Sequence, residues 1–428
     1  MAALLDTDVL VCGGGVAGTM AAVAAARQGA RVTLVERYGF LGGNATAGAV
    51  AQFNSWQTAN GRRVVAGLAD EVVARLRRHG AAGPHEVFTM STGHRMDRVA
   101  YSPEVLKLVL DELVLEAGVQ PLLHAALLDV QATGRRIDGV RVLTKGGVQA
   151  LRCRVLIDAS GDIDALQRAG ARFLDLAEGE ALQPATMMFR FGPIDFARFD
   201  ALAPAEIAAL AQRGYASGEL ARAALHVARD PDSADGWFNI SRLGIDATDP
   251  WSLSRAEMEG RRQAWQAAQF LAREVPGCAD GRLRAFGTQV GVRETRRVAG
   301  DHVLTAEELL APAAFPDAIA AGAYPIDIHP ASGGELDYRG LGDDHAYQIP
   351  YRSLIPDALD NALAVGRGIS ATHAALAAIR VMTISMAVGQ AAGVAAALAS
   401  AAPGDAAVRG VPLARLQDLL VEQGALLG

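Results

Sequence analysis

Three glycines near the beginning of the chain constrain its fold more than any other feature. Gly13, Gly15 and Gly18 follow an apolar run at residues 7–11 and precede an alanine-rich run at residues 19–28. Between a strand and a helix, the first glycine of this spacing permits a tight turn, the second lets the backbone approach a pyrophosphate, and the third lets the helix pack on the strand. The helix start then offers free N–H groups to phosphates, so the pattern predicts a dinucleotide site.

A second apolar run at residues 30–35 completes a strand–helix–strand unit, and Gly29 is placed to end its helix. Glu36 closes the second strand, where a carboxylate can accept hydrogen bonds from a ribose diol. This unit alone does not separate NAD from FAD. The glycine-rich loop at 38–46, the turn at 158–162 after a β-meander, and the return of the chain through Gly366-Arg367 favour FAD, because its flavin end needs contacts from distant segments.

Charge and cysteine content narrow the class of protein. A net charge of -7 argues against a nucleic-acid partner, and three cysteines without a CxxC pair argue against a disulfide framework or a metal cluster. We therefore expect no metal and a reducing, cytoplasmic location. The apolar start of the chain ends in glycines and is interpreted as a strand, not a signal peptide. The stretch at 381–399 is rich in Ala, Gly, Ser and Thr, which favours a buried helix over a membrane span.

The order of predicted elements indicates an α/β fold: a Rossmann-like FAD-binding domain, with a parallel sheet, a β-meander and helices, plus an inserted α+β substrate domain. We place the FAD-binding domain at 1–165, with an insertion at about 50–100, and its C-terminal return at 349–428; residues 166–348 form the substrate domain. The predicted elements include a helix at 103–117 capped by Ser102, strands at 120–132, 137–143, 148–157 and 185–191, helices at 204–213 and 254–274, and a returning strand at 362–365.

Several segments resemble the FAD-dependent oxidoreductases of the glutathione-reductase-like superfamily, and in particular a subgroup whose members mostly lack an assigned reaction. The segments span nearly the whole chain in the family's order: VCGGGVAGTMAA, ERYGFLGGNATAG, LIDASGDIDA, GVRETRRVAGDHVLT, YPIDIHP, IPYRSLIP and VGRGISATHAALAAIRVMTISMAVGQAAGVAAALA. Two of these segments are specific to the family: GVRETRR and the long C-terminal segment that begins with VGRGIS. The N-terminal segment VCGGGVAGTMAA alone would not identify the family.

The resemblance implies which residues contact FAD. They are Gly13, Gly15, Val16, Ala17 and Gly18 at the pyrophosphate, Glu36 at the adenosine ribose, Arg37, Gly42, Gly43 and Asn44 along the nucleotide, Ala159, Gly161 and Asp162 in a second signature, Gly366 and Arg367 near the ribityl or flavin, and Met382 and Thr383 at a helix start. That helix start would face the flavin C2 carbonyl, where its positive end stabilises negative charge. The loop at 42–48 has no histidine for covalent flavin attachment, so noncovalent FAD is expected.

A cluster of arginines is the first candidate for substrate binding. Arg293, Arg296 and Arg297 could clamp a carboxylate or support the flavin through paired hydrogen bonds. Ion pairing with Glu294 or Asp301 is the alternative. In a strand, Arg293 and Arg297 would share one face and Arg296 the other.

Two histidines and a tyrosine are candidates for proton transfer. His329 has a neighbouring acid, Asp327, that could set its tautomer, and His373 follows the Gly366-Arg367 segment where the flavin is expected. Tyr351 could donate a proton. For each of them, loop capping or packing is the alternative.

These features favour a dehydrogenase or reductase that transfers a hydride between flavin N5 and a small polar substrate, anionic substrates included. A flavin oxidase or monooxygenase that uses O2 is the first alternative, and a flavin-binding electron-relay subunit of a partner complex is the second. We expect a small-molecule substrate and neither nucleic acid nor membrane as a partner. The electron acceptor and the oligomeric state, a homo-oligomer included, are left open.

Overall fold

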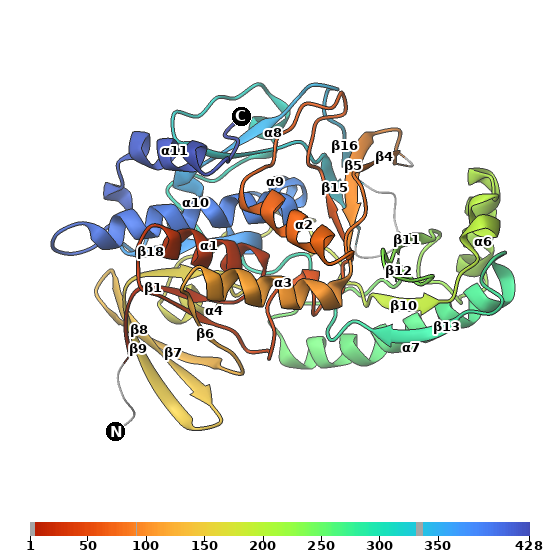
Figure 1. Ribbon diagram of the computed structural model, residues 1–428, viewed down its shortest axis with the longest axis horizontal. Helices are drawn as coiled ribbons and strands as arrows, with labels where there is room; N and C mark the ends of the chain where they lie inside the picture. Colours follow the sequence, from red (N-terminus) through yellow and green to blue (C-terminus); the bar gives the residue numbers. More distant parts are fainter. Residues whose placement is uncertain (1–4, 91, 331–336) are drawn as a thin grey trace.

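Two β-sheets at opposite ends of an elongated molecule organise the fold (Figure 1). The computed structural model describes residues 5–90, 92–330 and 337–428. Strands from the beginning and the end of the chain meet in the larger sheet, whereas the smaller sheet is built from the middle of the chain. Helices pack on a mixed sheet with a parallel half, which confirms the predicted α/β class.

The larger sheet has seven strands in the order β6-β2-β1-β9-β8-β7, with β18 also paired to β9. Parallel pairing joins β6, β2, β1, β9 and β18, and antiparallel pairing joins β9, β8 and β7. The meander is therefore present as predicted. The strands are β1 (Leu5–Cys12), β2 (Val32–Val35), β6 (Gln120–Leu122), β7 (Ala126–Thr133), β8 (Arg136–Thr144), β9 (Gly147–Asp158) and β18 (Ala362–Ala364).

One strand that the sequence predicts in this sheet is divided into two strands in the structure. The expected run at 120–132 divides into β6, which pairs with β2, and β7, which pairs with β8 at the other edge of the sheet. The chain leaves the first strand at His124, whose φ of 54° is incompatible with an extended strand. Apolar periodicity does not reveal such a break, because both halves carry strand-like side chains.

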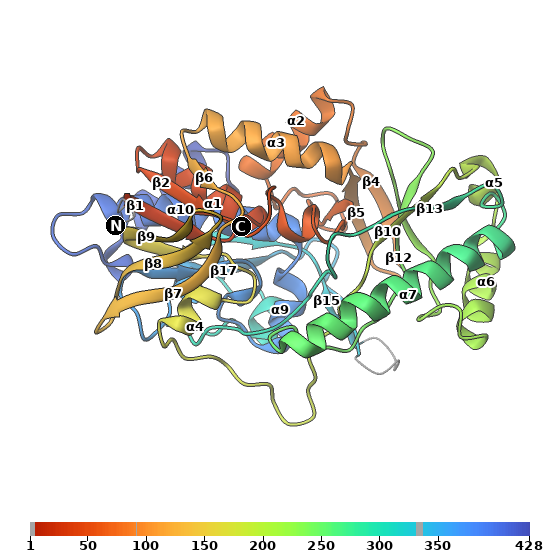
Figure 2. The ribbon, with the colours of Figure 1, turned by 90° about the horizontal axis from the view of Figure 1, so that it is seen from below.

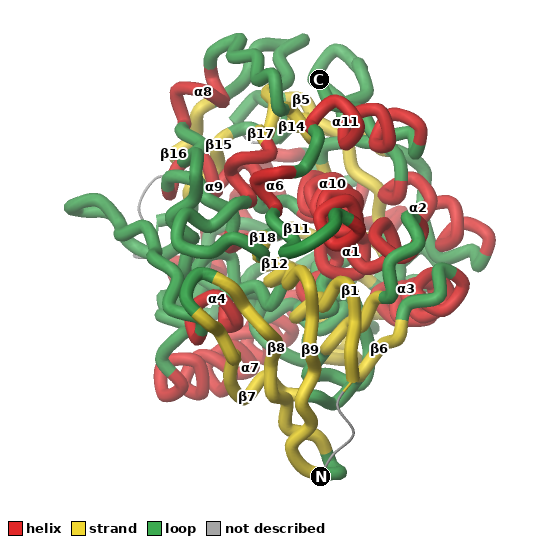
Figure 3. The backbone as a smooth tube through the Cα atoms, turned by 90° about the vertical axis from the view of Figure 1, so that its left-hand side faces the viewer, coloured by secondary structure: helices red, strands yellow, loops and turns green. Residues whose placement is uncertain are grey.

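The helices α1 (Val16–Arg27) and α10 (Met382–Ala401) lie side by side against the sheet (Figure 3). Their backbones touch because glycines of α10 face α1: a Cβ at Gly389 would collide with the carbonyl of Ala17, and one at Gly393 with the carbonyl of Ala21. By length and composition α10 could cross a membrane, but 89% of its apolar window is buried inside the molecule. It is a core helix, as predicted.

The segment that follows the first strand–helix–strand unit forms a layer of its own. It contains η1 (Gly43–Ala45), β3 (Gln52–Asn54), α2 (Leu68–Arg78), β4 (Glu86–Thr89), β5 (Arg95–Ala100) and α3 (Pro103–Glu116). The three strands make a small antiparallel sheet. Pro103 begins α3 as predicted, but Ser102 makes no side-chain capping bond, so its predicted capping role is wrong.

The smaller sheet has the order β11-β12-β10-β13 and its own apolar core (Figure 2). Its elements are β10 (Phe189–Gly192), α5 (Phe196–Asp200), α6 (Pro204–Ala216), β11 (His226–Arg229), β12 (Gly236–Asn239), α7 (Pro250–Glu274) and β13 (Arg282–Phe286). Both predicted helices are present and longer than expected. The predicted strand at 185–191 is only partly present, because Ala185 and Thr186 form isolated bridges and regular pairing begins at Phe189.

The remaining elements connect the two sheets and return the chain to the larger one. They are α4 (Asp164–Arg168), α8 (Ala306–Leu310), β14 (Ala318–Gly322), β15 (Ile326–Ile328), β16 (Asp337–Arg339), β17 (Tyr347–Pro350), η2 (Tyr351–Leu354), η3 (Gly366–Gly368), α9 (His373–Ile379), η4 (Val408–Gly410) and α11 (Leu413–Glu422). The predicted returning strand is β18, which pairs in parallel with β9 at Leu156–Asp158.

The contact between α1 and α10 gives a direct test of this packing. We expect Gly389→Ala to lower the free energy of unfolding by about 1–3 kcal/mol, because the added methyl group meets a backbone carbonyl that cannot rotate away. This loss exceeds the gain of about 1 kcal/mol that alanine brings to a helix interior. Urea denaturation measures it. The control is Gly410→Ala, where nothing lies within 4 Å of the new Cβ. Equal stability of the two variants would contradict the close packing.

Candidate cofactor and substrate site

The three glycines of the first turn have different surroundings. Gly13 adopts a φ of +104°, and a Cβ there would meet the backbone of Ala159. A Cβ at Gly18 would meet the carbonyl of Gly13, so these two glycines are required by packing. Gly15 is different: its backbone is ordinary, with φ -63° and ψ 174°, and the nearest atom to a Cβ would be the Cα of Gly43 at 4.0 Å. The protein itself does not require glycine at 15, which suits a position that a pyrophosphate approaches.

Glu36 lies at the end of β2, beside this turn. Its Oε2 accepts a hydrogen bond from the backbone N–H of Gly14 at 2.7 Å, and its Oε1 accepts one from the N–H of Tyr38 at 2.9 Å. Each carboxylate oxygen keeps a second lone pair. The carboxylate is therefore held rigidly and can still accept hydrogen bonds from a ribose diol, the role predicted for it.

The loop at 42–44 closes over the same turn. Gly42 has a φ of +110°, and its N–H donates to the carbonyl of Gly14 at 2.7 Å. Asn44 reaches further and donates from Nδ2 to the carbonyl of Val292 at 2.9 Å. Arg37, just before the loop, donates to Oε1 of Gln289 at 2.8 Å. The predicted nucleotide loop is thus joined to residues 289–292, which lie immediately before Arg293.

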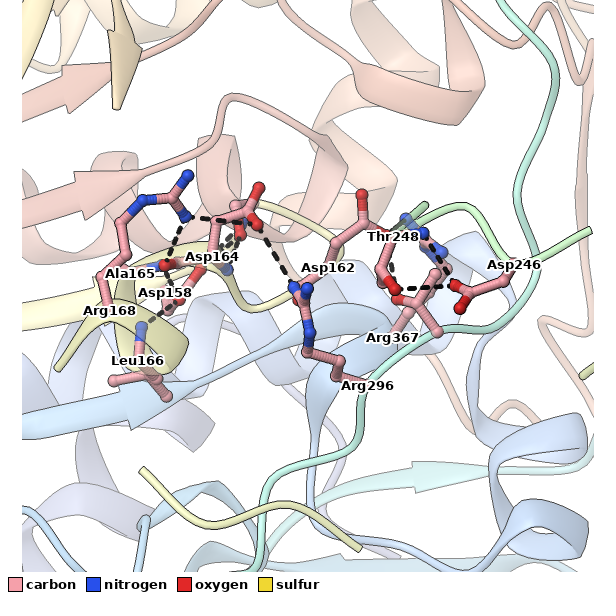
Figure 4. A network of polar contacts seen from close by, with 12 residues as sticks. Asp158, Asp162, Asp164, Ala165, Leu166, Arg168, Asp246, Thr248, Arg296 and Arg367 are labelled. Carbon is pink, nitrogen blue, oxygen red and sulfur yellow. Dashed lines mark hydrogen bonds and ion pairs between the residues drawn. The ribbon is translucent and has the colours of Figure 1, made fainter. Parts of the chain in front are cut away.

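The second predicted signature follows β9 and is organised by a residue that the sequence did not single out. Asp158 is fully buried and accepts hydrogen bonds from the N–H groups of Ser160, Ala165 and Leu166, so it holds the turn and the start of α4 (Figure 4). Burial raises its pKa. An acid placed at the end of a strand and followed within two residues by a serine is the signal that could have identified it.

Asp162, at the end of that turn, connects it to the returning chain. Its Oδ1 lies 2.9 Å from Nη2 of Arg367 and accepts a hydrogen bond from Thr295 (Figure 4). A Cβ at Gly161 would meet the same guanidinium. Nη1 of Arg367 is buried and has no hydrogen-bond partner among the described residues. This spare donor beside the glycine turn fits a cofactor rich in acceptor oxygens.

The returning chain reaches the first turn itself. A Cβ at Gly366 would lie 3.7 Å from the Cβ of Ala17, in the first turn of α1. Helix α10 begins at Met382, and Val381 at its N-cap position offers no side-chain bond. Its first N–H groups therefore remain available to a ligand. The hydroxyl of Thr383 is used within the protein, because it donates to the carbonyl of Asn54 at 2.6 Å.

The sequence predicts five catalytic candidates, and three of them are hydrogen-bonded to other residues of the protein away from the recess described below. His373 is buried, and its Nδ1 contacts Glu294 at 2.8 Å. Arg297 donates to the carbonyls of Ala371 and Asp175. The hydroxyl of Tyr351 donates to the carbonyl of Val408. Residues 293–297 form no strand, so the sharing of one face that a strand would give Arg293 and Arg297 does not apply.

The other two candidates, Arg293 and His329, line one small, shallow recess. We call it the arginine recess; its lining residues are Pro184, Ala185, Thr186, Arg222, Ser241, Arg242, Arg293 and His329. Sequence reasoning missed Arg222 and Arg242, which lie far from Arg293 along the chain and carry no motif.

A hydrogen-bonded carboxylate supports the histidine of this recess. Oδ2 of Asp327 accepts from the hydroxyl of Tyr324 at 2.9 Å and lies 3.3 Å from Nε2 of His329. Burial, together with the positive charges of Arg293 and Arg380, lowers the pKa of His329 to about 4 against the opposing effect of Asp327. His329 is therefore neutral at pH 7. Because Nε2 faces Asp327, its Nδ1 is the nitrogen free to exchange a proton.

The fold and the site together define a flavoprotein oxidoreductase of the α/β class. The chain belongs to the family described as FAD dependent oxidoreductase, which matches residues 8–420. Its cofactor is FAD, and the glycine turn, Glu36 and the spare donor of Arg367 fit that molecule.

One curated relative matches a short segment of the chain, and two solved structures share its fold. A cinnamate reductase of Clostridium sporogenes is 56% identical over 45 residues, which are 10% of this chain and only 7% of that enzyme. A geranylgeranyl bacteriochlorophyll reductase-like protein of Thermoplasma acidophilum is 13% identical, with a TM-score of 0.50 over 99% of this chain and 85% of its own. The flavin-dependent brominase Bmp2 is 14% identical, with a TM-score of 0.50 over 96% and 83%.

The different surroundings of the three glycines can be tested by substitution. We expect Gly15→Ala to leave the melting temperature of the apoprotein unchanged, since a Cβ meets no protein atom closer than 4.0 Å, while FAD affinity falls at least about tenfold, or about 1.4 kcal/mol. Gly18→Ala is the matched comparison and should destabilise the apoprotein itself. Thermal melts and flavin-fluorescence titrations measure both effects. Unchanged FAD affinity in the first variant would place the pyrophosphate elsewhere.

The lowered pKa of His329 makes stability depend on pH. The folded pKa of about 4 lies below the ordinary value of 6.5, so the unfolded chain binds more protons between these values and stability falls as the pH drops from 6.5 toward 4. We expect His329→Gln to remove part of this fall, roughly 1–3 kcal/mol. Urea denaturation at several pH values in this window measures the slope. Identical slopes in both proteins would contradict the assigned environment.

Proposed function

We propose that the protein is a dehydrogenase or reductase that transfers a hydride between flavin N5 and a carbon of a small polar organic substrate, anionic substrates included. One observation carries the proposal: the loop over the glycine turn is hydrogen-bonded to the segment that leads into Arg293 of the arginine recess. The hydrogen bond from Asn44 to Val292 joins the loop over the glycine turn to the residue that precedes Arg293. Arg380 in turn lies just before Val381, the N-cap residue of α10.

FAD, when bound, supplies the two-electron chemistry by exchanging a hydride at N5. The protein supplies the orientation and the proton. Arg293 and its neighbours hold the polar end of the substrate in the recess. His329 takes or gives a proton at Nδ1, and Asp327 holds its ring and tautomer while Tyr324 holds Asp327.

The finer features predicted for the cofactor belong to the same proposal. FAD is held without a covalent bond by the glycine turn, Glu36, the 42–44 loop, Asp162 and Arg367, as in the glutathione-reductase-like superfamily. Residues 166–348 serve as the substrate domain. The separate apolar core formed by the smaller sheet, α6 and α7 supports this division, and both Arg222 and Arg242 come from that region.

An anaerobic titration tests the reaction type. The protein is reconstituted with FAD, its visible absorption is recorded, and candidate polar substrates are added without oxygen. We expect a substrate or its reduced partner to bleach the flavin absorption, or to restore it after chemical reduction, at a rate that falls at least about tenfold in His329→Gln. A chain that fails to retain FAD would contradict the proposal. Turnover that requires oxygen and releases peroxide or an oxygenated product would indicate an oxidase or monooxygenase instead.

A further inference from the structure

The arginine recess has an excess of positive charge that the described residues do not balance. Arg222 and Arg242 form no side-chain hydrogen bond or ion pair with any of them. Arg293 donates from Nη1 to the carbonyl of Pro184 at 2.5 Å and to the hydroxyl of Thr186 at 2.8 Å, which are both neutral acceptors. The three recess arginines are half-buried, whereas Arg75 on α2 is buried and pairs with two glutamates.

A fourth arginine, Arg380, lies close to the three arginines of the recess. Arg380 donates to Oε1 of Gln183 at 3.1 Å and to the backbone carbonyl of Asp327 at 3.4 Å, again neutral acceptors. Its Nε, Nε2 of Gln183 and Oδ1 of Asp327 are buried without a partner in the described part of the chain. Asp327 is the acid that faces these cations, and its Oδ2 is already shared by Tyr324 and His329.

Without a bound anion, the unpaired charges of these arginines are unfavourable for the folded protein. Burial, followed by the charges of Arg380 and Arg222, lowers the pKa of Arg293 to about 9, so the guanidinium remains charged at pH 7 in spite of its surroundings. Charges that are removed from water are normally paired in proteins, because losing their hydration without gaining a partner is unfavourable. The missing negative charge is therefore expected to come from a molecule that enters the recess.

We propose that the substrate is a small carboxylic acid whose carboxylate is bound in the arginine recess by Arg222, Arg242 and Arg293. Its being the substrate, and not merely a ligand, rests on the proposed function. A planar guanidinium matches a carboxylate with two parallel hydrogen bonds. None of the residues that line the recess is a glycine, whereas phosphates are usually held by glycine turns and helix starts.

Binding measurements on the FAD-loaded full chain test the assignment. The probes are acetate, benzoate and succinate, the matched amides acetamide, benzamide and succinamide, and inorganic phosphate and sulfate, all at one ionic strength. Shifts of the flavin absorption spectrum and of the melting temperature report binding. We expect at least one carboxylate to bind at least about tenfold more tightly than its amide and than either inorganic anion.

Substitutions in the recess separate a binding role from a structural one. We expect Arg222→Gln and Arg293→Gln each to weaken carboxylate binding at least about tenfold, to keep FAD, and to leave the ligand-free melting temperature unchanged or raised, because each variant removes an unpaired charge. If these arginines had a structural role, replacing them would lower the ligand-free melting temperature. The control is Arg255→Gln on the exposed side of α7, which should bind carboxylates like the unchanged protein.

Each outcome decides the assignment. It would be overturned if no carboxylate shifts either signal in protein that carries FAD, if the amides or inorganic anions bind as tightly, or if the recess variants bind carboxylates normally. Bleaching of the flavin by neutral substrates alone would also overturn it while leaving the proposed hydride transfer intact. Failure to load FAD would contradict the proposed function instead, and the melting temperature of the apoprotein with carboxylates would still decide whether the recess binds them.

Discussion

The close contact between α1 and α10 is the interaction on which the rest of the site depends. Gly389 and Gly393 let the backbone of α10 rest on Ala17 and Ala21, so two helices from opposite ends of the chain share one layer. The returning chain reaches the same end of α1, where Gly366 lies near Ala17, and α10 begins at Met382, seven residues before Gly389. Without the contact between α1 and α10, the glycine turn would remain a binding site for a pyrophosphate, but no helix start would be present where the flavin ring is expected.

Two parts of the molecule are suited to bind a negatively charged group, and they use different kinds of donor. Beside the glycine turn it uses backbone N–H groups and a helix start, which carry partial charges and are held by secondary structure. In the arginine recess it uses side chains that come from three separated stretches of the chain, with full charges and few acids beside them. The first arrangement is suited to a resident cofactor. The second is suited to a molecule that must enter and leave, because side chains can reorient around it.

The cofactor half of the site could be predicted from the sequence because its signals are local. The glycine spacing, the acid at the end of β2 and the start of α10 at Met382 are each contained in a single strand–turn–helix or helix pattern. Sequence patterns gave less information on the substrate half. Arg222 and Arg242 are brought to Arg293 only by tertiary packing, and no period relates them.

Other features of the site that the sequence did not reveal have the same origin. Residues 293–297 form an irregular segment, so the sharing of one face that a strand would give Arg293 and Arg297 does not apply. The acid that His373 contacts, Glu294, comes from a distant part of the chain, and the place of His373 near the flavin stays a prediction. Side-chain chemistry alone does not tell which partner a buried histidine finds.

The pairing of β18 with β9 has a consequence for how the protein is made. Ala362 lies beside Leu156 in the sheet, so the ribosome must synthesise more than two hundred further residues before this strand can find its neighbour. The smaller sheet, whose strands are all contained between Phe189 and Phe286, can be complete while residues 156–158 of β9 still lack the neighbour that β18 provides. Long-range parallel pairing of this kind forms slowly and leaves apolar surface exposed in the meantime. We therefore expect the middle of the nascent chain to fold before the larger sheet is complete, and chaperones to act at that stage.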